Sequence, residues 1–115
     1  LEHPSAAEPW AALSLTYAGL GRREEALAAA KKCLELVPPE ENPSAAAGYT
    51  VFIFGGYATL AQVQARFGMT DEALAIVKAQ AAAGWWRRNY LLLSSEWSML
   101  RKDPRFREIA EKAPL

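Results

Sequence analysis

Residues 10–38 read WAALSLTYAGLGRREEALAAAKKCLELVP, and this stretch decides the fold of the 115-residue chain. Its first half places large apolar residues at steps of three and four, the spacing of one helix face: Trp10, Leu13, Tyr17 and Leu20. A second apolar stripe follows Gly21 and stops at Pro38, because proline cannot supply the backbone N–H that a helix needs. We therefore predict an antiparallel helical hairpin, with the bulky row of the first helix facing Ala26 and Ala30 of the second.

The same pattern returns further along the chain. Tyr57, Leu60, Ala61 and Gln64 repeat the spacing of Trp10, Leu13, Ser14 and Tyr17. Gly68 lies 47 residues after Gly21, and residues 71–73 repeat the acid-acid-alanine pattern of residues 24–26. This internal repeat predicts a second hairpin. Its first helix lies in the apolar segment 49–67, although residues 51–54 can also be interpreted as a strand.

Two local signals bound the last helix of that second hairpin. Thr70 or Asp71 is a suitable N-cap, and Gly84 is a suitable C-terminal stop. After Gly84 the repeat pattern gives way to a dense bulky set: Trp85, Trp86, Leu92, Trp97, Leu100 and Phe106. Asp103-Pro104 is typical of a helix start. The sequence thus predicts a helical tail that closes the apolar end of the two hairpins.

The first hairpin resembles a tetratricopeptide (TPR) repeat, whose pattern is W-x2-L-G-x2-Y, A-x3-F and a closing proline over about 34 residues. The matching residues are Trp10, Leu13, Tyr17, Ala26 and Pro38. The chain departs from the pattern at Ser14, where glycine is usual, and at Ala30, where an aromatic residue is usual. The resemblance implies an all-α, TPR-like α-solenoid of two antiparallel helical hairpins plus a short helical C-terminal cap.

The tail carries a second resemblance. Residues 97–106, W-x2-LR-x-DPRF, are similar to the end of TPR segments in bacterial multidomain signalling proteins. Together the two resemblances imply one TPR-like domain over 1–115: repeat 1 at about 7–40, a connection at about 39–48, repeat 2 at about 49–84 and a capping tail at 85–115. Because the chain starts at Leu1 without a methionine, we expect it to be a piece of a larger regulatory protein.

Composition excludes several classes of partner. Thirteen basic and thirteen acidic side chains leave no net charge, which argues against a nucleic-acid or anionic-membrane surface. The apolar segment 49–67 is too short and too interrupted to span a bilayer, so no membrane insertion is expected. Cys33 stands where a small core residue is wanted, and a single cysteine favours a reducing, cytoplasmic location. The lone His3 has no companion ligand, so no metal is expected.

Reactive motifs are missing from the sequence. It has no nucleophile elbow, phosphate loop or zinc-ligand spacing, so we expect no enzyme activity and no cofactor. A helical-repeat fold instead implies a non-catalytic scaffold that binds a protein or peptide. Two alternatives stay open: the chain is a structural cap or self-association domain of a signalling protein, or a tail tryptophan lines a ligand groove.

The resemblance also implies where a partner binds. The family's concave positions correspond to Glu8, Ala11, Leu15 and Ala18 in the first repeat and to Gly55, Ala58, Gln62 and Arg66 in the second. TPR proteins that grip a terminal carboxylate carry lysine and asparagine where this chain has Ala11 and Leu15. We therefore expect a hydrophobic or helical ligand and no preference for an acidic C-terminal peptide.

Overall fold

The computed structural model describes residues 8–36, 38 and 56–115, and within them the chain forms helices and turns with no strand. The elements in chain order are α1 (Glu8–Gly19), α2 (Arg23–Leu36), α4 (Gly56–Arg66), α5 (Thr70–Ala82), α6 (Arg88–Leu93), the 3-10 turns η2 (Ser95–Trp97) and η3 (Leu100–Lys102), and α7 (Pro104–Lys112). The predicted all-α class is confirmed. Residues 51–54 and the predicted start of the third helix lie outside the described residues.

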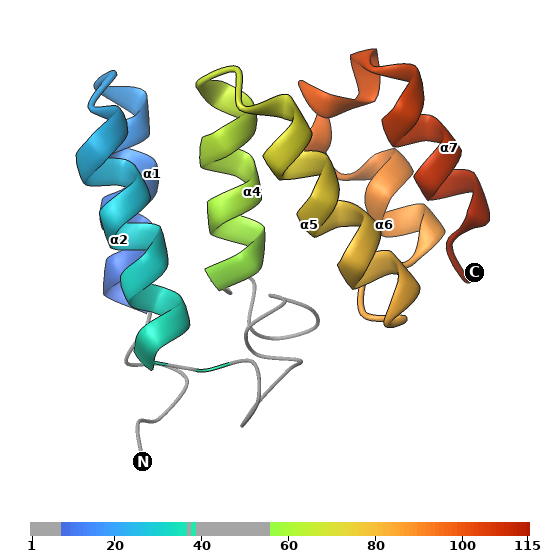
Figure 1. Ribbon diagram of the computed structural model, residues 1–115, viewed down its shortest axis with the longest axis horizontal. Coiled ribbons are helices and arrows are strands. Elements are labelled where there is room, and N and C mark those ends of the chain that lie inside the picture. The colour runs from blue at the N-terminus through green and yellow to red at the C-terminus, as the bar shows by residue number, and fades with distance from the viewer. Residues whose placement is uncertain (1–7, 37, 39–55) are drawn as a thin grey trace.

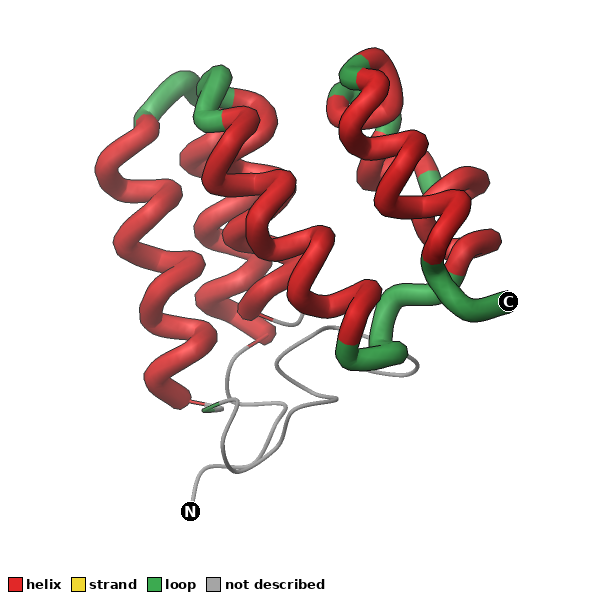
Figure 2. Tube along the Cα trace, turned by 45° about the vertical axis from the view of Figure 1, so that its right-hand side comes forward, coloured by secondary structure: helices red, strands yellow, loops and turns green. Residues whose placement is uncertain are grey.

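The helices follow one another in pairs across the molecule, as Figure 1 shows. α1 packs against α2, and both contact α4, which packs in turn against α5. α7 contacts both α5 and α6, so the tail continues the row beyond the second hairpin. The turned view in Figure 2 shows the same succession of antiparallel helices.

Three glycines end helices α1, α4 and α5 with the same geometry. Gly21, Gly68 and Gly84 have φ angles of 79°, 76° and 87°, a left-handed conformation that favours glycine. In each turn the next N–H donates to the carbonyl five residues back: Arg22 to Tyr17 at 2.9 Å, Met69 to Gln64 at 2.8 Å and Trp85 to Gln80 at 3.1 Å. The predicted glycine stops are confirmed, and the third turn shows that this motif continues into the tail.

The inner face of α1 is made of small residues rather than the predicted bulky row. Ala11, Ser14 and Ala18 are buried, whereas Trp10 and Leu13 are 38% and 37% exposed. This part of the prediction is wrong because α1 is apolar on most of its circumference, and its small side lets α2 approach more closely. The approach is close enough for the Ser14 hydroxyl to donate a 2.6 Å hydrogen bond to the carbonyl of Ala26.

The tail residues supply most of the bulk of the larger core. Trp86, Leu91, Trp97 and Phe106 are fully buried there and join Ala73, Leu74 and Val77 of α5. The ring centroid of Trp97 lies 4.9 Å from that of Trp86 and 6.5 Å from that of Phe106. Trp85 and Leu92 are only partly buried against this cluster. A tail this deeply packed is part of the same core as the second hairpin.

Of the N-caps predicted for α5 and α7, only that of α7 is confirmed. Asp103 caps α7 as predicted: its side chain accepts from the Arg105 N–H at 2.9 Å, and Pro104 occupies the first turn. Hydrogen bonds from Arg105 also lower the pKa of the Asp103 carboxyl. The predicted cap of α5 is wrong, because Met69 precedes Thr70 at that helix start and no side chain caps it.

Candidate functional site

A groove runs between α1, α4 and the η2 turn. It has a volume of about 400 Å³ and is lined by Leu15, Ala18, Gln62, Val63, Arg66, Ser95, Glu96, Ser98 and Met99. Four of these residues belong to the set predicted from the TPR resemblance: Leu15, Ala18, Gln62 and Arg66. The fold therefore brings side chains 48 positions apart, such as Ala18 and Arg66, to one surface feature. We call it the α1/α4/η2 groove.

The other four predicted residues do not line this groove. Ala11 and Ala58 are fully buried, so their side chains offer no surface to a partner. Both face neighbouring helices, where small residues permit close packing. Glu8 is the first residue of α1, and Gly55 lies outside the described residues.

Glu96 fixes the tail side of the groove through three hydrogen bonds. Its Oε2 atom accepts from the Tyr90 hydroxyl at 2.9 Å and from Gln62 Nε2 at 3.4 Å, and its Oε1 atom accepts from the Ser94 hydroxyl at 3.0 Å. Burial, reinforced by the Glu96 charge, raises the pKa of Tyr90, so the phenol stays a neutral donor. The Gln62 bond ties α4 to η2 and holds the two walls of the groove in place.

Arg66 marks the other end of the groove. Its Nε donates at 3.0 Å to the carbonyl of Ala18 in the last turn of α1, which also accepts from the Gly21 N–H at 3.1 Å. No carboxylate in the described parts of the chain forms an ion pair with Arg66. The lining of the groove thus includes one anionic side chain, Glu96, and one cationic side chain, Arg66.

Sequence reasoning missed the contribution of the tail to this groove. Val63, Ser95, Glu96, Ser98 and Met99 were not among the predicted site residues, although they line it. The Gln62–Glu96 hydrogen bond joins residues 34 positions apart. Helical periodicity carries no information about a contact of that range. The nearest available signal is the polar pair Ser95-Glu96 beside the buried Trp97.

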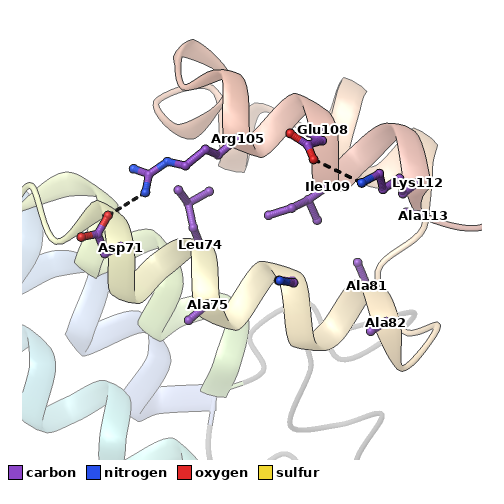
Figure 3. Close-up of a pocket in the computed structure, with 11 residues that line it drawn as sticks. Asp71, Leu74, Ala75, Ala81, Ala82, Arg105, Glu108, Ile109, Lys112 and Ala113 are labelled. Atoms are coloured by element: carbon purple, nitrogen blue, oxygen red, sulfur yellow. Dashed lines mark hydrogen bonds and ion pairs between the residues drawn. The ribbon is translucent and has the colours of Figure 1, made fainter.

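A second groove of about 480 Å³ lies between α5 and α7. Figure 3 shows Leu74 and Ile109 facing each other across it, with two ion pairs along its rim. Arg105 contacts Asp71 at 2.9 Å, and Lys112 contacts Glu108 at 3.2 Å. The α1/α4/η2 groove differs from it in being lined by four of the residues predicted from repeat position: Leu15, Ala18, Gln62 and Arg66. We therefore take the α1/α4/η2 groove as the candidate site.

Burial raises the pKa of Cys33 to about 11, which keeps its thiol protonated at neutral pH and unreactive as a nucleophile. No three His, Cys, Asp or Glu side chains within residues 8–36, 38 and 56–115 gather as a metal site.

No family model, curated protein or solved structure matches this chain. The TPR resemblance accordingly stays a prediction from the sequence motifs. Among the helices that the structure describes, none is long and apolar enough to cross a membrane.

Proposed function

We propose that this chain is a non-catalytic protein-interaction module, part of a larger regulatory protein, that binds a hydrophobic or helical partner segment in the α1/α4/η2 groove. The observation that carries the proposal is the convergence of Leu15, Gln62 and Arg66 with Glu96 of the tail on one surface groove. Residues chosen by their repeat positions meet there without any arrangement of groups suited to catalysis.

The lining of the groove indicates the chemistry of the ligand. Leu15 and Met99 offer apolar surface, and Met99 is half exposed with a flexible thioether that adapts to different side chains. Gln62 and Arg66 stand beside this surface and can bond polar groups of a ligand backbone. An amphipathic helix that inserts one apolar side chain fits this combination.

The proposal predicts weak discrimination of a terminal carboxylate. Among the described residues, Arg66 is the only basic one that lines the groove, and its Nε already donates to Ala18. Carboxylate recognition needs several convergent donors. A partner segment is thus expected to bind equally well with a free or an amidated C-terminus.

A displayed library of amphipathic helical peptides, selected on the immobilised chain, tests the proposal. Selected peptides should lose about tenfold or more in affinity for Leu15→Asp and Met99→Asp, because both changes charge the apolar lining. Glu72→Lys, an exposed change on α5, is the control and should alter affinity less than twofold. Calorimetric titration measures each affinity.

Two outcomes contradict the proposal. Peptides that bind both groove variants as tightly as the unmodified chain would place the binding surface elsewhere. Affinity that disappears when the peptide C-terminus is amidated would overturn the predicted ligand class.

The structural alternative also has an observation in its favour. The tail buries Trp86, Trp97 and Phe106 against α5, which suits a domain whose role is to close the end of a helical stack. Under this alternative the chain caps other domains of its parent protein, and no selected peptide would depend on Leu15.

A further inference from the structure

The outer side of the α1/α2 hairpin carries an apolar surface away from the rest of the molecule. A groove of about 320 Å³ runs between the two helices, and Trp10, Leu13 and Tyr17 of α1 line one wall of it. Figure 1 shows α1 and α2 at one end of the row of helices, with α4 on their other side. This outer face is distinct from the α1/α4/η2 groove.

The α2 side of the outer face has an ordered series of charges. Going along the chain, Arg22, which directly precedes α2, and Glu25, Lys32 and Glu35 within α2 alternate between positive and negative, and Ala28 and Ala29 occupy the centre. Lys31 also lines the groove, and an antiparallel crossing between Ala28 and Ala29 places it opposite Ala26 of the second copy. Within one copy, Arg22 contacts Glu25 at 3.4 Å and Lys32 contacts Glu35 at 3.7 Å. All four charged side chains keep solvent access, so each can reach a second partner.

This series is complementary to itself when two copies of α2 run antiparallel. With the crossing point between Ala28 and Ala29, Glu25 of one protomer stands opposite Lys32 of the other, and Arg22 stands opposite Glu35. Every charge of the series then faces an opposite charge, twice over by symmetry. A parallel arrangement would place like charges together, which is unfavourable.

We propose that the chain forms a symmetric dimer in which each α2 lies in the outer groove of the other copy. Alanines at the crossing point allow the helix axes to approach to about 8 Å. Trp10 and Leu13, more than a third exposed in one copy, would be covered by the second copy. Tryptophan is a residue type that dominates binding energy when it becomes buried at an interface. A two-fold symmetric interface uses the same patch on both copies, so assembly stops at the dimer.

Sedimentation equilibrium of the full chain over a range of concentrations tests this arrangement. The apparent mass should rise with concentration from 12.6 kDa towards twice that value and then stop. Glu25→Lys and Lys32→Glu should each weaken self-association by about tenfold or more, because each puts like charges opposite one another. Glu72→Lys makes the same charge change on α5 and should leave the dissociation constant within about twofold.

A double charge-swap variant distinguishes specific pairing of Glu25 with Lys32 from a general effect of altered charge on self-association. The double variant Glu25→Lys/Lys32→Glu restores opposite charges and should self-associate within about threefold of the unmodified chain. Mixing the two single variants should give a heterodimer, since each lysine then faces a glutamate. Far-UV circular dichroism confirms that the variants fold, as expected for changes at solvent-accessible positions.

Three results would overturn the dimer. The first is a mass of 12.6 kDa at every concentration. The second is equal self-association of both single variants and the unmodified chain, and the third is growth of the mass beyond two copies, which indicates head-to-tail stacking. None of these results bears on peptide binding in the α1/α4/η2 groove, so this proposal and the proposed function fail separately.

Discussion

Phe106→Ala tests whether the tail and the second hairpin unfold as one unit. The Phe106 ring is fully buried, lies 6.5 Å from the Trp97 ring centre and belongs to the same core as Leu74. Removing such a ring costs about 3–5 kcal/mol, against a total stability of about 5–15 kcal/mol for a domain. Since 1 kcal/mol corresponds to about 4–8 °C in Tm for domains of 60–100 residues and to about 2–4 °C for 150–250 residues, we expect the Tm of this 115-residue chain to fall by roughly 10 °C or more.

Thermal unfolding followed by far-UV circular dichroism measures this change. Arg107→Ala is the matched control, because Arg107 is the exposed neighbour on the same helix and its removal should alter stability by about 0.5 kcal/mol or less. Truncation before Trp97 should have a still larger effect than Phe106→Ala, with aggregation from the uncovered surface of α5. If Phe106→Ala melts within about two degrees of the unmodified chain, the tail does not share the core and our reasoning about the cap is wrong.

Two further predictions concern hydrogen bonds that join separate elements. Ser14→Ala should lower the free energy of unfolding by about 1–3 kcal/mol, because the Ala26 carbonyl loses its buried hydroxyl partner. Ser14→Val should cost more, since it also adds bulk at a close helix contact. Equal denaturant midpoints for the two variants and the unmodified chain would contradict this reasoning. Arg88→Ala should lower the free energy of unfolding by about 1–3 kcal/mol, because the partly buried Arg88 donates to the Ala113 carbonyl at 3.3 Å. The control Arg87→Ala, at an exposed position, should cost about 0.5 kcal/mol or less. If urea unfolding gives the reverse order, the Arg88 contact does not anchor the C-terminal segment.

Local backbone signals were the most dependable part of the sequence. Gly21, Gly68 and Gly84 mark helix ends, because the left-handed backbone conformation that follows these helices strongly favours glycine. Asp103 beside Pro104 likewise indicates the start of α7, because the Asp103 side chain accepts a hydrogen bond from the nearby Arg105 N–H. Each of these signals depends on neighbours within a few residues, so it can be interpreted without knowledge of the fold.

Helix rotation and the composition of the groove could not be predicted in the same way. In α1 both the bulky side with Trp10 and the small side with Ala11 have helical spacing, and only the fit against α2 and α4 decides which is buried. The α1/α4/η2 groove depends on how the tail packs against α4, a long-range tertiary contact that brings Glu96 to Gln62. Four groove residues were found because repeat position fixes their helix face, and the tail residues were not because they follow no repeat.

In the segment 95–100 every third residue is buried in the core, and the two residues before each of them line the groove. Trp97 and Leu100 are buried, while Ser95, Glu96, Ser98 and Met99 line the groove. A change at Ser98 or Met99 therefore alters the surface of the groove and leaves the buried contacts of Trp97 and Leu100 in place. Under the proposed function, partner preference could therefore change by single substitutions at these exposed positions while the buried contacts that stabilise the fold stay the same.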